Sequence, residues 1–153
     1  MESQRNKELS RQVLERGFNQ GDLTVFDEYI DPAGVDHQEP PGTNLIEHLK
    51  TVVQSMRTAF PDLMFEIHEM IAEGDLVAFR CTMTGTHSGL WDMHVGPRIP
   101  PTGRRVSVPH LYLVRVQHGK TTDLWHQWNL PLLLQQLGVA AGPPAPGRSP
   151  GQG

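Results

Sequence analysis

The sequence predicts an α+β fold, in which a cone-shaped, curved antiparallel sheet is closed by three N-terminal helices to form an α+β barrel. Apolar residues recur at helical spacing through the first sixty residues, and they alternate with polar residues from about residue 63 to residue 128. A run of helices followed by a run of strands is typical of α+β domains. The 153 residues suit one domain, which we expect to span residues 1–138 and to enclose a cavity.

Two helices are expected before residue 32. Residues 8–20 place apolar side chains near helical spacing, and Gly21 ends this first helix. Asp22 suits the N-cap of a second, short helix that carries its apolar residues on one face. Pro32 stops this helix, because proline lacks the backbone N–H that a helix interior requires.

A third helix is expected after a loop over residues 36–43. Thr43 or Asn44 supplies its N-cap, an apolar stripe runs along it to Phe60, and Pro61 closes it. This helix carries the most regular apolar stripe of the three. It is therefore expected to pack against the sheet that follows.

The C-terminal half changes to a period of two, which predicts strands that form an antiparallel meander. The alternation slips at Met70 and Ile71, and this slip indicates a β-bulge. A loop rich in Gly and Pro covers residues 87–104, and a turn at His118 and Gly119 joins the last two strands. The expected strands span residues 63–71, 77–84, 106–116 and 121–128, and a short helix over residues 130–138 follows them.

Composition argues against several classes of protein. The net charge of −4 does not favour nucleic-acid binding, which needs a basic stripe. No apolar run approaches the ~18 residues of a membrane span, and the polar N-terminus does not resemble a secretory signal, so a cytoplasmic location is expected. The single Cys81 forms no internal disulfide, and we expect it to pack in the core. Residues 139–153, rich in Ala, Gly and Pro, are expected to be disordered.

His110 and Tyr112 are the first informative pair of polar residues. They alternate on one face of a strand with Val106, Val108 and Val114, and such an apolar face is expected to point inward. Buried polar aromatics require hydrogen-bond partners. The pair is therefore either a satisfied part of the core or the polar floor of an apolar ligand pocket.

A second group of aromatic and ionisable residues lies in the segment 123–129, whose sequence is DLWHQWN. His126 shares a strand face with Trp128, whereas Trp125 lies on the opposite face, and alternation alone does not decide which face is inward. The dipeptide Asp36-His37 lies in the loop before the third expected helix, where it forms either a simple turn or part of the pocket mouth.

Motifs for metal, nucleotide or serine chemistry are not found in the sequence. It contains no HExxH, GxGxxG, P-loop or Gly-x-Ser-x-Gly element. We therefore expect no metal and no cofactor. The chemistry expected is acid/base catalysis by His, Asp and Tyr side chains.

Several segments together resemble the SnoaL-like polyketide cyclase (ester cyclase) family of the nuclear-transport-factor-two-like cone superfamily. They run from about residue 14 to residue 138 and include FNQGDLTVFDEYIDP, TGTHSG, IPPTGRR, HGK and LLQQLG. The resemblance implies a cone-shaped barrel, paired as a homodimer or homotetramer through the outer sheet face. It also implies ring closure of a polyketide ester by intramolecular aldol condensation without metal or cofactor. Relatives in the family and superfamily include hydroxylases, epoxide-opening enzymes and isomerases.

The resemblance indicates which positions of this sequence correspond to the site of the cyclases, although the residue types at those positions differ. The catalytic Asp of the cyclases falls on His126, which favours an inward His126; their inward Gln and His fall on His110 and Tyr112, and their mouth Asn falls on Asp36. A histidine at position 126 is able to act as a base near neutral pH. His94 is expected over the cavity mouth, and the four remaining histidines are expected at the surface: His48, His68, His87 and His118.

The loop over residues 90–103 is longer than in many similar proteins, and we expect it to form a lid that brings Trp91 near the mouth of the cone. The sequence thus predicts a cofactor-independent acid/base cyclase for a hydrophobic, polyketide-like intermediate. An epoxide-opening enzyme, a hydroxylase and a non-catalytic binding protein remain alternatives. The expected catalytic residues are His126, His110 and Asp36, and the expected substrate contacts are His37, Tyr112, Trp128 and Trp91.

Overall fold

The structure, a computed structural model, describes residues 1–93 and 96–139. The expected disorder over residues 139–153 and the expected position of His94 therefore fall almost entirely outside the described residues. The elements are α1 (Glu2–Gln12), the π-helix η1 (Val13–Asn19), α2 (Thr24–Tyr29), β1 (Ile30–Asp36), α3 (Leu45–Ala59), β2 (Met64–Glu73), β3 (Leu76–Thr86), β4 (Arg105–Gln117), β5 (Lys120–Trp128) and α4 (Leu130–Gln136).

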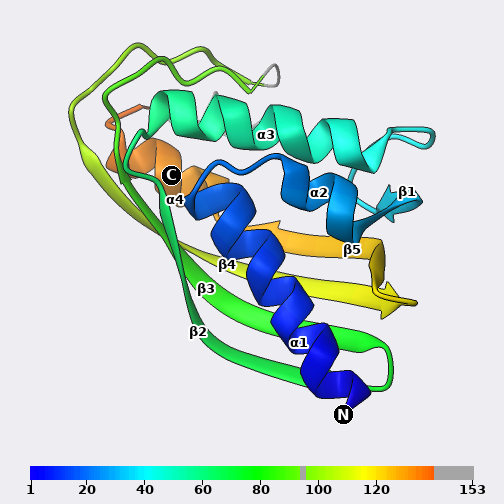
Figure 1. Cartoon of the computed structure of the whole chain (residues 1–153). Helices are drawn as coiled ribbons and strands as arrows, with labels where there is room; N and C mark the ends of the chain where they lie inside the picture. Colours follow the sequence, from blue (N-terminus) through cyan, green and yellow to red (C-terminus); the bar gives the residue numbers. More distant parts are fainter. Residues whose placement is uncertain (94–95, 140–153) are drawn as a thin grey trace, which may run out of the picture.

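The five strands form one curved sheet in the order β1-β5-β4-β3-β2. Strands β2 to β5 form the expected antiparallel meander, and a register shift between Ile67 and Glu69 confirms a bulge slightly before the expected place. The α+β class and the curved sheet covered by N-terminal helices are confirmed, but the strands themselves do not close into a barrel, because the edge strands β1 and β2 do not pair with each other in the described structure. Helices α1, α2 and α3 lie on the side toward which the sheet curves (Figure 1).

Strand β1 was not expected from the sequence, which indicated a helix end and a loop at residues 30–36. It pairs in parallel with β5, and Asp36 lies opposite Leu124. Pro32 and Gly34 are poor residues for a central strand, but an edge strand tolerates the missing N–H of proline. Strand β1 matters for the site because it places Asp36 in the protein interior.

The N-terminal helix begins at Glu2, six residues earlier than expected, and is wound as a π-helix from Val13 to Asn19. Asn44 caps α3 as expected, since its side chain accepts a hydrogen bond from Glu47 N–H at 3.0 Å. The apolar faces of these helices meet the inward residues of the sheet in one core. Cys81 lies in that core with no exposed surface, and burial raises its pKa to about 12, so it packs as expected.

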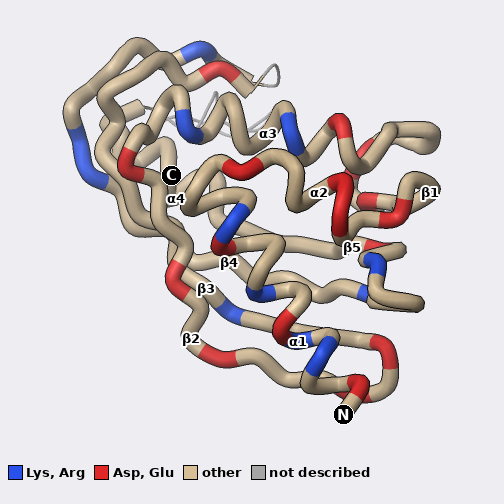
Figure 2. The backbone as a smooth tube through the Cα atoms, in the orientation of Figure 1, with Lys and Arg blue, Asp and Glu red and all other residues tan. Residues whose placement is uncertain are grey.

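Charged residues of both signs are interspersed along the helices and strands, as Figure 2 shows. None of the helices among the described residues is long and apolar enough to cross a bilayer.

The ends of the long loop after β3 are held together by His87. Its backbone N–H donates to the Arg104 carbonyl (2.8 Å) and its carbonyl accepts from Gly103 N–H (2.8 Å), while Thr102 N–H donates to its ring Nδ1 (3.2 Å). The expectation that His87 lies at the surface is wrong, because the residue is fully buried beside the ring of Phe60. The THSG and PPTG segments therefore meet in space and close the loop.

Gly89 lies where the same loop crosses the end of α3. A Cβ atom added at residue 89 would lie 1.9 Å from the carbonyl oxygen of Thr58. We expect Gly89→Ala to lower the free energy of unfolding by about 3 kcal/mol, since backbone atoms would have to move apart. Urea unfolding measures this loss, and Ser88→Ala at the exposed neighbouring position provides a control that should change stability by less than ~0.5 kcal/mol. Equal stabilities of the two variants would contradict the close approach.

Candidate active site

The inner face of β4 carries the two polar aromatics that the alternation placed inward. His110 is 4% exposed, and its ring contacts the edge of Phe65 and stacks on Trp128, with centroids 5.1 and 5.2 Å away. Tyr112 stacks on Phe79 with a centroid distance of 5.0 Å. The His110 ring is therefore surrounded by aromatic rings rather than by water, whereas Tyr112 is partly buried.

His110 is a neutral imidazole in this setting. Burial, reinforced by the nearby His126, lowers the pKa of His110 to about 3. The Tyr112 hydroxyl lies 3.4 Å from His110 Nδ1, and burial raises the pKa of Tyr112, so the phenol stays protonated at neutral pH and is able to donate to Nδ1. His110 Nε2 is buried and has no hydrogen-bond partner among the described residues, and it carries the imidazole proton in the tautomer in which Tyr112 donates to Nδ1. The sheet thus presents an unpaired imidazole nitrogen in the interior.

Asp36 approaches this row of rings from the neighbouring strand β1. Its side chain is 1% exposed, and its Oδ1 accepts a hydrogen bond from Gln38 N–H at 2.9 Å. Burial alone would raise the pKa of Asp36, but the hydrogen bonds and positive charge that His126, Gln38 and His48 provide lower it below the ordinary value. Asp36 is therefore a carboxylate at neutral pH.

His126 lies on β5 between Asp36 and Tyr112. Its Nε2 is 3.4 Å from Asp36 Oδ2, and its ring runs alongside that of Tyr112 with a centroid distance of 5.8 Å. The side chain of Gln38 accepts a hydrogen bond from the His126 backbone N–H and so fixes the strand beside the Asp36 turn. A carboxylate beside Nε2 favours the tautomer with its proton on Nε2, which leaves the lone pair of Nδ1 free to accept a proton.

Two tryptophans close the aromatic wall of this site. Trp91, at the start of the long loop, is 3% exposed and lies 6.3 Å from Trp128 and 5.9 Å from Phe60, measured between ring centroids. Backbone hydrogen bonds in both directions between Trp91 and Ile99, each 2.9 Å long, hold it there. Trp91 is thus part of the packed wall rather than of a detached lid.

His37 does not join this group, although the sequence led us to expect it in the same cavity. Its ring stacks on Trp125 with a centroid distance of 4.4 Å, and its Nε2 lies 2.8 Å from Asp123 Oδ1. Both partners belong to the face of β5 opposite to His126. That expectation is wrong because successive strand residues point to opposite faces, so an inward Asp36 requires an outward His37.

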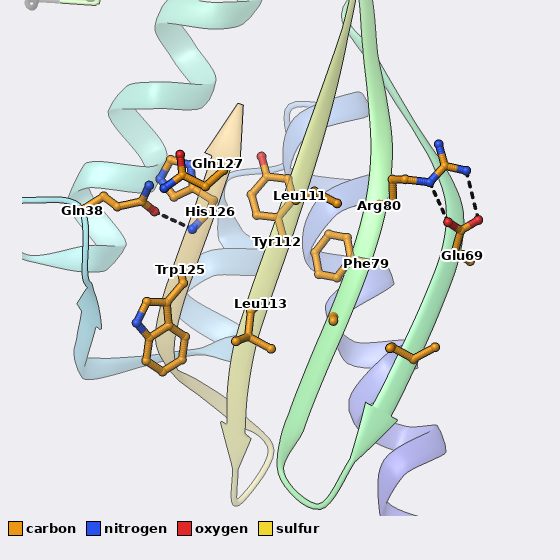
Figure 3. Close-up of a pocket in the computed structure, with 12 residues that line it drawn as sticks. Gln38, Glu69, Phe79, Arg80, Leu111, Tyr112, Leu113, Trp125, His126 and Gln127 are labelled. Atoms are coloured by element: carbon orange, nitrogen blue, oxygen red, sulfur yellow. Dashed lines mark hydrogen bonds and ion pairs between the residues drawn. The ribbon is translucent and has the colours of Figure 1, made fainter. Parts of the chain in front are cut away.

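Two spaces flank the polar row. A small apolar recess of about 50 Å³ lies between α1, α3 and the sheet, and Tyr112, Leu124 and Phe79 contribute to its lining. On the opposite, outer face, a groove of about 480 Å³ crosses β3 to β5, with the Arg80–Glu69 ion pair at one edge and Gln38 at the other (Figure 3). Pairing of two copies through this outer face stays a prediction.

The residues near Asp36 that were missed as site residues are Gln38, Glu39 and His48. Gln38 supports the His126 backbone, as described above. His48, one turn into α3, was expected in solvent, but its Nε2 lies 2.9 Å from Glu39 Oε1 and 3.8 Å from Asp36 Oδ2. A helical His at the N-terminal end of α3, near a loop with two acidic residues, was the signal available in the sequence.

A curved sheet covered by helices, with a buried carboxylate–histidine pair and an unpaired imidazole nitrogen among aromatic rings, defines a small α+β domain that gathers ionisable groups on the inner face of its sheet. The chain belongs to the SnoaL-like polyketide cyclase family, whose model matches residues 8–137. No curated protein shows a significant match to the chain.

Solved structures share this fold closely. TsrD from Streptomyces laurentii is 24% identical with a TM-score of 0.77, over 89% of this chain and 96% of that one. IdmH from Streptomyces antibioticus, a candidate polyketide cyclase, is 33% identical with a TM-score of 0.72, over 88% and 99% of the two chains. AclR from Streptomyces galilaeus, a candidate hydroxylase, is 27% identical with a TM-score of 0.72, over 89% and 97%.

Proposed function

We propose that this protein is an acid/base cyclase that closes a ring in a hydrophobic, polyketide-like intermediate without a cofactor. The observation that carries this proposal is the Asp36–His126 pair, in which a buried carboxylate faces His126 Nε2 at 3.4 Å near the neutral His110, whose Nε2 is unpaired. The pair supplies a base, and His110 supplies a hydrogen-bond donor. Membership of the cyclase family supports the same class of reaction.

The first step is removal of an acidic proton from the carbon next to a substrate carbonyl. His126 Nδ1 takes this proton, and the Asp36 carboxylate stabilises the imidazolium that results. The electron pair of the broken C–H bond becomes an enolate, whose oxygen accepts a hydrogen bond from His110 Nε2–H. The N–H is already in place and buried, so it stabilises the developing charge without reorganising.

The second step forms the new carbon–carbon bond. The enolate carbon attacks a second carbonyl group of the same molecule, and the alkoxide that forms takes the proton back from the His126 imidazolium. No atom is gained or lost, so the immediate product is an isomer of the substrate. The aromatic wall of Trp91, Trp128 and Phe65 suits a flat, apolar polyketide and excludes water from the enolate.

Mass spectrometry of reactions with a panel of linear aromatic polyketide esters and related epoxides tests the reaction class. A cyclase converts a keto ester to a product of the same mass, or of that mass less one water if dehydration follows. A hydroxylase would add one oxygen, and an epoxide hydrolase would add one water. Either of those changes, or binding of the esters without any turnover, would contradict the proposal.

A further inference from the structure

We propose that Asp36, Glu39 and His48 form a binding site for a zinc-type divalent metal ion at the mouth of the cone. The three residues come from the end of β1, the loop after it and the first turns of α3. Each offers one ligand atom, and these atoms lie within 4.8 Å of one another. The expectation of no metal rested on short sequence motifs, which do not register ligands that a loop and a helix bring together.

The spacing of the ligand atoms suits one tetrahedral ion. Nitrogen and oxygen ligands about 2.0–2.1 Å from zinc lie about 3.3 Å apart in a tetrahedron. His48 Nε2 lies 2.9 Å from Glu39 Oε1 and 3.8 Å from Asp36 Oδ2. His126 Nε2 lies 3.4 Å from the same Asp36 oxygen but does not belong to the group of mutually close ligand atoms, so water would complete the tetrahedron.

The second observation is the state of the Asp36 oxygen. Oδ2 belongs to a side chain that is 99% buried and accepts no well-directed hydrogen bond from the described residues, although two imidazole nitrogens flank it. A buried carboxylate oxygen that lacks a hydrogen bond is costly unless a cation or donor compensates it. A metal ion among the three groups would compensate it and would also use the Nε2 lone pair of His48.

The donor set selects the class of ion. Imidazole nitrogen combined with carboxylate oxygen suits zinc and similar transition metals, whereas magnesium and calcium prefer oxygen ligands alone. His48 is partly exposed, with 24% of its side-chain surface accessible, so an ion has a route to the site from solvent. A metal bound here takes up the Asp36 oxygen that faces His126, so metal binding and the proposed acid/base role exclude each other.

Titration of the full-length protein with Co²⁺ and Zn²⁺ tests the site directly. We expect one equivalent of Co²⁺ to give the intense visible absorption of a tetrahedral centre, Zn²⁺ to displace it, and Zn²⁺ to raise the melting temperature. His48→Ala and Glu39→Gln should each weaken binding at least about tenfold, since the first removes a direct ligand and the second replaces a charged carboxylate ligand by a neutral amide. His68→Ala and His118→Ala, which remove histidines far from Asp36, should bind as the wild type does.

Weak binding of several ions, or binding that His48→Ala and Glu39→Gln leave unchanged, would overturn the proposal. Circular dichroism and melting curves of the variants without metal establish that they are folded, and Glu39→Gln preserves the side-chain shape if His48→Ala proves unstable. The readouts are optical and thermal rather than catalytic. A failure of the metal site therefore leaves the proposed cyclase function standing, and a failure of that function leaves the metal site standing.

Discussion

Replacement of His126 by glutamine is expected to lower kcat for ring closure by about 10²- to 10⁴-fold, the usual contribution of a general base. Glutamine can donate a hydrogen bond from its amide to the buried Asp36 carboxylate, so this carboxylate keeps a hydrogen-bond donor. It has no lone pair basic enough to take a proton from carbon. The melting temperature should therefore change little while turnover is lost.

His37→Gln is the matched control, because it makes the same chemical change one residue beyond Asp36. His37 stacks on Trp125 at the outer face of the sheet and faces Asp123 instead of the interior. We expect this variant to keep kcat within a few-fold of the wild type. Comparable turnover in the His126→Gln protein and the wild type would remove His126 from the proposed chemistry.

Replacement of His110 by phenylalanine is expected to change how stability depends on pH. The folded protein holds the pKa of His110 at about 3, whereas an unfolded histidine has its ordinary value of 6.5. Between these values the unfolded chain binds a proton that the folded protein does not, so the contribution of His110 to stability falls as pH falls. The slope is about 1.4 kcal/mol per pH unit, and it vanishes above pH ~6.5 and below pH ~3.

Urea unfolding at several pH values between about 4.5 and 6.5 measures this slope, in a window above the ordinary pKa of the carboxylates. Phenylalanine keeps an aromatic ring against Phe65 and Trp128 but cannot bind the proton. The stability difference between wild type and His110→Phe should therefore shift in favour of the wild type as pH rises. A difference that stays constant over this window would show that His110 is not held in its neutral form.

The alternation of residues along β4 was sufficient to predict the inner face of the sheet, because a strand exposes every second residue to one side. Val106 and Val108 fixed the side on which His110 lies, and the structure buries all three. The parity of β5 was not fixed by the turn alone. Matching the terminal LLQQLG segment to the family placed His126 inward, and its contacts with Asp36 and Tyr112 agree with that placement.

Strand β1 and the groups around Asp36 were harder to predict, for physical reasons. Pro32 and Gly34 disfavour a strand locally, and only pairing with β5 at the sheet edge stabilises it. The side of the loop on which Asp36 and His37 lie depends on that pairing. The contact between His48 and Asp36 likewise joins a helix to a strand end, and no local pattern encodes such a distance.

The buried His87 shows a different limit of sequence reasoning. A histidine beside Ser88 and Gly89 in a polar loop is typical of a surface turn, but hydrogen bonds to Thr102 and Gly103 draw it into the core. The partners lie fifteen or more residues away along the chain, so composition near His87 gives no sign of them. The family motifs THSG and PPTG therefore have a structural role here, since they anchor the loop that carries Trp91.

Proton exchange at the substrate carbon tests most directly whether His126, held by Asp36, performs acid/base chemistry inside the cone. A substrate analogue that keeps the acidic C–H bond and its neighbouring carbonyl, but lacks the carbonyl that the enolate attacks, cannot close its ring. In D₂O containing EDTA, only the first step of the reaction is then observed. The wild type should exchange the α-proton for deuterium, His37→Gln should do so at a similar rate, and His126→Gln should exchange no faster than buffer. Exchange by His126→Gln at the wild-type rate would contradict the account.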